Sequence, residues 1–249
     1  MIQSLPLVHS DKARLKVQLW LIVFGWSLMV LLLLIWSLNN EEAEMLELAR
    51  QEAINNFNKD QAFRVWATTH GGVYVPVTER TQPSPHLKHI PERDLVTPSG
   101  RRLTLMNPAF MLRQMMDDYA DLYGVRGRIT SIKTLNPDNA PDDWEWAALK
   151  SFERGEKEQF ELTDIDGEPY LRLIRPMQVQ AGCLKCHYNQ GYQVGDIRGG
   201  VGISVPMRDY FATTAGQKRK ISMGLGLIWL VGLSAIGFYG RRSYQRLEE

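Results

Sequence analysis

The sequence predicts an α+β domain with an antiparallel sheet, placed between two transmembrane helices. Two observations predict this arrangement. Long uncharged apolar runs lie near both ends of the chain, separated by roughly 180 residues, enough for one domain with its own core. The elements expected between the runs come in the order helix, helix, strand, helix, hairpin, strand, which is typical of an α+β fold.

The two apolar runs are long enough to cross a bilayer. Residues 17–40 read VQLWLIVFGWSLMVLLLLIWSLNN, and residues 221–240 read ISMGLGLIWLVGLSAIGFYG. A transmembrane helix needs about 20 apolar residues to cross about 30 Å of hydrocarbon. No small-x-small cleavage motif follows the first run, so we expect an uncleaved anchor rather than a signal peptide.

Basic residues flank the outer ends of both runs, and the positive-inside rule places such ends in the cytoplasm. These residues are Lys12, Arg14, Lys16, Arg241, Arg242 and Arg246. The basic cluster from Lys218 to Lys220, just before the second run, favours the opposite orientation of that run. We expect cytoplasmic tails at 1–16 and 241–249, with the domain between the spans on the opposite side.

Local signals predict the first elements of that domain. Apolar residues at helical spacing predict a juxtamembrane helix over 41–69, and such helices often pair in a homodimer. Segment 70–105 is rich in Pro, Gly and Thr and has short β-type runs such as 73–77, and we expect a largely irregular loop there. Asn107 as N-cap, Pro108 at the first helical position and Gly124 past the end predict a helix between them.

The second half of the domain carries equally local signals. Residues 126–135 (RGRITSIKTL) alternate as a strand does, and a proline-bounded turn leads into a helix over 141–154. The Asp166-Gly167 pair predicts a hairpin within 157–179. The last strand before the final helix is expected over 199–207 (GGVGISVPM).

Both cysteines of the chain lie in one C-x-x-C-H motif formed by Cys183, Cys186 and His187. Two thiols at this spacing can close a disulfide, hold zinc or bond to haem. The adjacent histidine favours haem, because in this motif the sulfurs form thioethers with the porphyrin and the imidazole is the proximal iron ligand. A structural zinc site would need a second Cys or His pair, which the other histidines do not form. We expect one covalent haem c per chain, attached in the periplasm.

Four segments of the chain resemble a bacterial family of periplasmic c-type haem domains with a PAS-like fold. They are FNKDQAFRVWATTHGGVYVPVTERTQPSPHL, LTLMNPAFMLRQ, LNPDNAPDDWEWAALKSF and CLKCHYNQGYQVGDIRGGVGISVPM. Many members of that family sit between two membrane spans at the sensory end of histidine kinases or diguanylate cyclases. The resemblance covers residues 41–215 and implies a periplasmic sensory domain anchored in the bacterial inner membrane.

The expected function follows from the motif and the resemblance together. The sequence ends at Glu249, nine residues after Gly240, without a kinase or cyclase domain. We therefore expect a haem-binding sensory module that reports redox state or a small ligand to a separate signalling protein. A membrane-tethered electron-transfer cytochrome with its own redox partner is the alternative. We expect neither an enzyme, because no acid/base constellation accompanies the motif, nor nucleic-acid binding, because the net charge is only +1.

The sixth ligand of the iron has several candidates. We expect His70, which precedes two glycines at a helix end, because both cysteines are already used. Free-standing members of the resembling family use a cysteine on the corresponding helix. Met111 and Met115 are alternatives that would otherwise be core residues. His86 and His89 are interpreted as exposed loop residues.

Charged residues near these motifs have two expected roles. A guanidinium fork suits the two haem propionates, and we expect Arg198 to bind one because it lies in the GDIRGG run of the resemblance. The other arginines that could do so are Arg126, Arg128, Arg172 and Arg175. The acidic residues Asp142, Asp143 and Glu145 are expected in the first turn of a helix, where the macrodipole favours negative charge.

Overall fold

The computed structural model describes residues 5–248 and contains two compact units. One unit is formed by the two ends of the chain, up to Leu46 and from Asp209 onward, and the other by Glu47–Arg208. The predicted α+β class is confirmed, since the central unit has two antiparallel sheets with helices around them.

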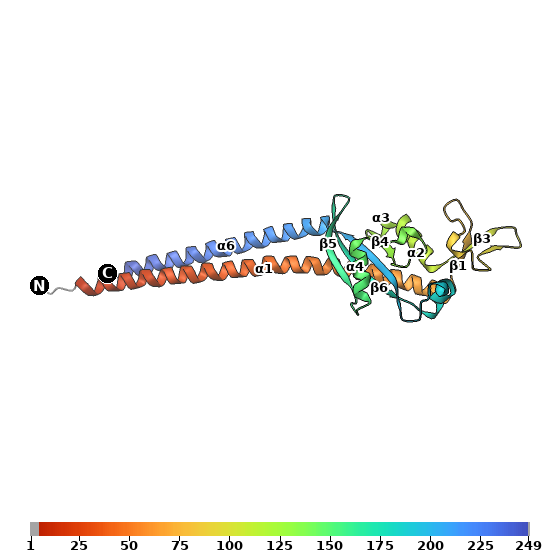
Figure 1. Ribbon diagram of the computed structural model, residues 1–249. Helices are drawn as coiled ribbons and strands as arrows, with labels where there is room; N and C mark the ends of the chain where they lie inside the picture. Colours follow the sequence, from red (N-terminus) through yellow and green to blue (C-terminus); the bar gives the residue numbers. More distant parts are fainter. Residues whose placement is uncertain (1–4, 249) are drawn as a thin grey trace. The chain divides into compact units, whose positions relative to one another are not determined.

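The terminal unit consists of the first part of helix α1 (Leu5–Thr69) and most of helix α6 (Arg208–Arg246), which lie antiparallel (Figure 1). Both helices are long and apolar enough to cross a membrane. Trp26 Nε1 donates to the Trp229 carbonyl over 3.2 Å, and Trp229 Nε1 donates to Ser27 Oγ over 3.0 Å. A side chain at Gly232 would collide with the Trp26 ring, so the small residue allows this close packing. Lys218, from the basic cluster before the second run, pairs with Glu42 over 2.9 Å.

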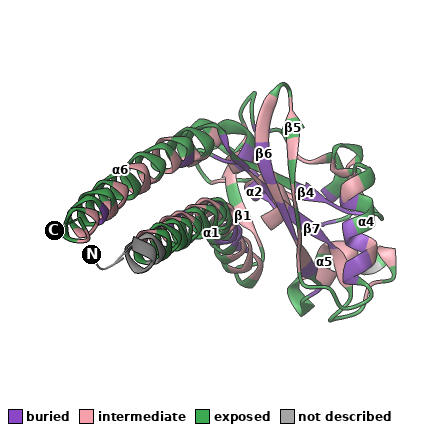
Figure 2. Cartoon of the chain, turned by 90° about the vertical axis from the view of Figure 1, so that its left-hand side faces the viewer, coloured by how far each residue is buried: buried purple, intermediate pink, exposed green. Residues whose placement is uncertain are grey.

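The larger sheet of the central unit is antiparallel, with strand order β4-β7-β6-β5. Its strands are β4 (Arg126–Thr130), β5 (Gln159–Ile165), β6 (Glu168–Gln178) and β7 (Ile197–Pro206). The hairpin between β5 and β6 turns at Asp166 and Gly167, both with positive φ (59° and 83°), as predicted. Figure 2 shows buried residues concentrated along β4, β6 and β7, so the core of this unit lies on the sheet.

Helix α4 (Asp143–Phe152) covers the sheet through a cluster of Ala148, Leu149, Phe152 and Ile174. It begins with a capping box, in which Asp142 accepts from the Glu145 amide and Glu145 accepts from the Asp142 amide. Asp143 and Glu145 lie in the first turn as predicted, whereas Asp142 precedes it as the N-cap. The predicted strand over 126–135 is shorter than expected, because β4 ends at Thr130.

The helix predicted between Pro108 and Gly124 begins and ends as expected but is broken in the middle. Asn107 Oδ1 accepts from the Phe110 amide over 2.8 Å at the start of α2 (Pro108–Asp118). Tyr119 leaves the helical region (φ −125°, ψ 21°), and α3 (Ala120–Tyr123) then ends at Gly124, whose φ is 68°. The expectation of one continuous helix was wrong at this residue.

The expectation of an irregular loop over 70–105 was also wrong. This segment forms most of a second sheet with order β1-β3-β2, made of β1 (Val73–Pro76), β2 (Asp94–Val96) and β3 (Arg102–Met106). A 3₁₀ turn, η1 (Pro85–Leu87), lies between β1 and β2. Leu105 on β3 packs with Leu87 and Ile90 in a buried cluster, which gives this Pro-rich segment a small core of its own.

Candidate functional site

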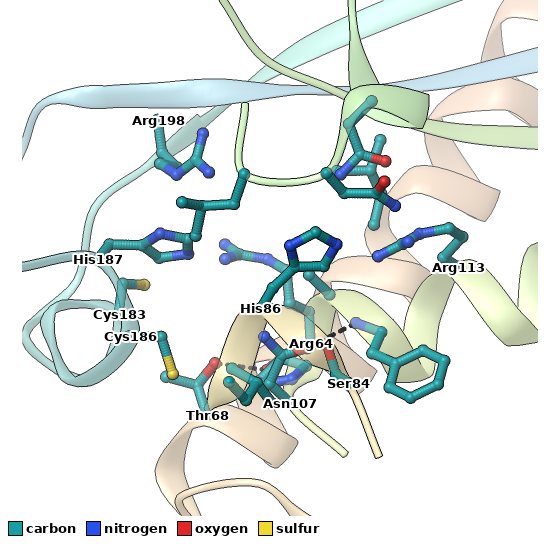
Figure 3. A pocket seen from close by; sticks show the side chains of 18 of the residues that line it. Arg64, Thr68, Ser84, His86, Asn107, Arg113, Cys183, Cys186, His187 and Arg198 are labelled. Atoms are coloured by element: carbon teal, nitrogen blue, oxygen red, sulfur yellow. Dashed lines mark hydrogen bonds between the residues drawn. The ribbon is translucent and has the colours of Figure 1, made fainter. Parts of the chain in front are cut away.

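A cavity of about 410 Å³ lies in the central unit, a size typical of small-molecule and cofactor sites. Its walls come from the end of α1, from η1, from α2 and from the ends of β4, β6 and β7. All four residues of the predicted cofactor site, Cys183, Cys186, His187 and Arg198, line it (Figure 3). The fold therefore brings the C-x-x-C-H motif and the GDIRGG arginine to one space.

The C-x-x-C-H motif is carried by three short turns in succession. They are η3 (Ala181–Cys183), α5 (Leu184–His187) and η4 (Tyr188–Gln190). Both thiols are free, and the Gln180 amide lies 3.4 Å from Cys183 Sγ. Because Cys183 and Cys186 are three residues apart across a helical turn, their side chains fall on the same side. The two thiols and the adjacent imidazole therefore face one cavity, and the thiols are not joined in a disulfide.

The imidazole of His187 has a defined tautomer. Its Nδ1 lies 2.7 Å from Gln190 Oε1, while Gln190 Nε2 donates to the Lys133 carbonyl over 2.9 Å. Since this second bond orients the amide, Oε1 is the acceptor and Nδ1 carries the proton, so Nε2 has its lone pair free. Burial, and next the nearby Arg198 charge, lower the pKa of His187 and favour this neutral ring.

The second thiol is held in an apolar environment. Cys186 packs against the buried cluster of Leu87, Ile90 and Leu105, and burial raises the pKa of its thiol. Glycine is required nearby, because a side chain at Gly182 would collide with Thr68. The motif is therefore fitted closely against both α1 and the segment that carries η1.

Arg198 differs from the other four arginines considered for the propionates. Its guanidinium donates to Ser131 Oγ and lies 5.3 Å from the Tyr192 ring, but its Nε is buried without a hydrogen-bond partner among residues 5–248. Burial lowers its pKa. The other four are engaged in protein ion pairs outside the cavity lining, in the pairs Arg126–Asp166, Arg128–Glu145, Arg172–Asp142 and Arg175–Glu158.

Two cavity residues were missed by the sequence reasoning, namely Arg64 and Arg113. His86 is exposed, as interpreted from the sequence, but it also lines the cavity. Arg113 Nε is buried without a hydrogen-bond partner in the described part of the chain, and Arg64 Nε donates to the neutral Gln61 side chain over 2.9 Å. An arginine within the apolar run AFMLRQMM of a well-capped helix was a signal that could have identified Arg113.

The candidates for the sixth ligand of the iron differ in whether they line the cavity. His70 is not among the lining residues; its Nδ1 lies 2.8 Å from the Trp66 carbonyl, and its ring is 4.5 Å from the Trp66 ring. Met111 and Met115 do not line the cavity either, whereas His86 does. Ligation by His70 stays a prediction, and the cavity lining contains another imidazole, that of His86, from a different element.

The donor set fits a haem. Among the residues whose side chains the structure describes, no group of three or more His, Cys, Asp or Glu side chains is arranged to hold a metal ion. Two thiols and a neutral imidazole suit covalent attachment and proximal ligation. The orphaned Nε atoms of Arg113 and Arg198 suit a ligand that brings its own carboxylates.

Comparison with known proteins supplies the family. A family model described as Tll0287-like matches residues 40–206, which include the whole cavity lining. The chain belongs to the Tll0287-like family. A solved structure, the cyanobacterial heme-protein Tll0287, is similar with 18% identity and a TM-score of 0.41 over 64% of this chain and 94% of that chain. No curated protein matches.

Proposed function

We propose that this Tll0287-like domain binds one haem c covalently and acts as a membrane-anchored sensory module. The observation that carries the proposal is the convergence of Cys183, Cys186 and His187 on a cavity that Arg64, Arg113 and Arg198 also line. None of these three arginines has a carboxylate partner among the described residues, whereas a fourth lining arginine, Arg80, pairs with Asp118. Membership of a family named after Tll0287, which is a heme-protein, supports the same cofactor.

Each cysteine has a defined part in attachment. Cys183 and Cys186 would each hold the porphyrin through one thioether, with the thiol sulfur bonded to one carbon of a vinyl group and the thiol hydrogen transferred to the other. This addition needs free thiols, and both cysteines are free. When bound, the haem supplies a one-electron redox centre and an iron site for small ligands.

His187 and the arginines orient the group. His187 offers Nε2 to the iron, because the bond from its Nδ1 to Gln190 fixes the ring orientation and raises its basicity. Arg198 and Arg113 pair with the propionates, which would satisfy their orphaned Nε atoms. We further propose that the sheet, whose first strand β4 pairs with its last strand β7, is a PAS-like scaffold for this site.

Membrane anchoring is the second part of the proposal. The apolar stretches of α1 and α6 are suited to span the bacterial inner membrane, and basic residues flank their outer ends. In this orientation the central domain, and hence haem attachment, would be periplasmic. Reporter fusions after Gln245 should be active only in the cytoplasm, and fusions near residue 100 only in the periplasm; the reverse pattern would overturn this orientation.

The sensory role is supported by the extent of α1. This single helix contains the apolar run 17–40 and also Arg64 and Thr68, which line the cavity. A change in redox state or ligation that moves these side chains acts directly on a helix that continues into the membrane anchor. A signalling protein that contacts the anchor would then receive the signal, without enzymatic turnover by this chain.

A second candidate function is a membrane-tethered electron-transfer cytochrome c. The observation that favours it is the second imidazole in the cavity, because an iron with both axial positions filled is suited to electron transfer. Spectra of the reduced full chain under CO or NO separate the two roles. Binding of either gas at a physiological rate supports ligand sensing. A low-spin haem that binds neither gas, and whose reduction potential does not change when a signalling protein is added, supports the electron-transfer role. That result overturns the sensory role.

A further inference from the structure

A second imidazole, that of His86, lies in the cavity that holds His187. The two side chains come from different elements, His86 from η1 and His187 from α5, and both project into the cavity (Figure 3). Among the residues that the structure describes, His86 makes no hydrogen bond or ion pair with its side chain. Its ring is therefore free to bind a ligand that enters the cavity.

The turn that carries His86 is anchored beside the haem-attachment motif. Leu87 is 1% exposed and belongs to the buried cluster on which Cys186 packs. The turn is closed by the Leu87 amide donating to the Ser84 carbonyl over 3.2 Å, and the Arg93 guanidinium donates to the same carbonyl over 3.3 Å. The position of His86 is thus fixed relative to one of the two thioether-forming sulfurs.

Other cavity residues are less suited to bind iron opposite His187. Met177 lines the cavity, but it is only 7% exposed and belongs to strand β6 of the sheet core. His70 lies outside the lining, with Nδ1 hydrogen-bonded to its own helix. Arginine does not lose its proton in proteins and so does not act as a ligand.

We infer that His86 supplies the sixth ligand, so that the iron is held between two imidazoles. This inference rests on the proposed binding of haem by Cys183, Cys186 and His187. Bis-imidazole ligation keeps the iron low-spin and gives a lower potential than His/Met ligation. Because His86 lies on a short surface turn rather than in the sheet, its release would open the iron to a small ligand while the covalent bonds keep the haem in place.

The test uses the full chain, produced with a cytochrome c maturation system and purified in detergent. Optical and electron paramagnetic resonance spectra of the ferric protein report the spin state. His86→Ala should convert the low-spin haem to a high-spin form that binds CO when reduced, and added imidazole should restore the low-spin spectrum. Restoration shows that the site is intact and lacks only its ligand.

Three matched variants assign the ligand. His89 lies outside the cavity lining, but its charge contributes to lowering the pKa of His187, so His89→Ala tests a competing imidazole and should stay low-spin. His70→Ala and Met177→Leu replace the competing candidates and should also stay low-spin. If His86→Ala and His86→Met both keep the wild-type spectrum and potential, or if only His70→Ala or Met177→Leu opens the site, the inference is wrong although haem binding stands. Absence of covalent haem from the wild-type protein would instead overturn the proposed function.

Discussion

The Nδ1 atom of His187 lies 2.7 Å from the side-chain oxygen of Gln190. This contact decides the tautomer of the proposed proximal ligand, because the Gln190 amide nitrogen is already bonded to the Lys133 carbonyl. A hydrogen bond of this kind increases the basicity of a metal-bound imidazole and stabilises the ferric state. It is therefore a way in which this chain sets the potential of its haem.

Gln190→Leu should raise the reduction potential. Loss of one hydrogen bond weakens donation from His187, and a net value of 0.5–1.5 kcal/mol corresponds to roughly 20–60 mV. Potentiometric titration of the full chain measures the shift. Gln193→Leu, an exposed neighbour, is the control and should change nothing. Equal potentials for the two variants would show that Gln190 does not tune the ligand.

Arg113→Leu should lower the reduction potential. Its guanidinium, of which Nε is buried, is proposed to neutralise a propionate, and removing a positive charge near the iron disfavours reduction by roughly 20–100 mV. Arg126→Leu is the matched control, because Arg126 pairs with Asp166 outside the cavity. A potential that falls by the same amount in both variants would point to a general charge effect rather than to a propionate contact.

Gly199→Ala should destabilise the sheet next to the site. A side chain at Gly199 would collide with the Thr130 carbonyl on β4, so the strand next to Arg198 would have to move, at about 1–3 kcal/mol. Gly202→Ala is the control on the same strand, since its nearest contact would be 3.7 Å away. Thermal unfolding compares the two, and a Gly199→Ala melting temperature equal to that of Gly202→Ala contradicts this account.

Asp60→Asn should stabilise the protein at neutral pH. Asp60 is 4% exposed, and burial raises its pKa to about 6, with only partial compensation by Lys59. The folded state therefore holds a proton that the unfolded chain releases near pH 4, so stability falls as pH rises from about 4 through 6. At pH 8 the asparagine should add on the order of 2 kcal/mol, and at pH 4 almost nothing.

Unfolding of the full chain in detergent at a series of pH values checks the Asp60 prediction. The advantage of Asp60→Asn over wild type should grow as pH rises across this range. Asp117→Asn, an exposed carboxylate, is the control and should show no such trend. A pH-independent difference would mean that folding does not raise the pKa of Asp60.

Much of the fold could be predicted because its signals are local. The cap at Asn107, the hairpin at Asp166 and Gly167, and the first-turn acids of α4 each depend on residues within a few positions of one another. The smaller sheet could not be predicted in this way. Its pairing of Val73 with Met106 joins residues far apart in sequence, and its core depends on contacts of Leu105.

The residues of the candidate site also differ in whether local sequence signals could predict them. Cys183, Cys186 and His187 are adjacent in sequence, so the motif alone indicated their chemistry, and Arg198 follows soon after. Arg113 and His86 come from elements far along the chain, and they join the cavity only because α2 and η1 fold beside the motif. For His86 the decisive contact is the packing of Cys186 on the cluster that contains its neighbour Leu87. The spacing of apolar residues in the sequence does not predict this contact.

The most direct test of the central claim is haem retention through denaturing electrophoresis. The full chain, expressed with a cytochrome c maturation system, should run as a single peroxidase-stained band, and its mass should exceed that of the chain by one haem. Cys183→Ala combined with Cys186→Ala should lose the stain while the protein is still produced. A wild-type band without haem, under conditions in which a control cytochrome c keeps its own, would contradict the account.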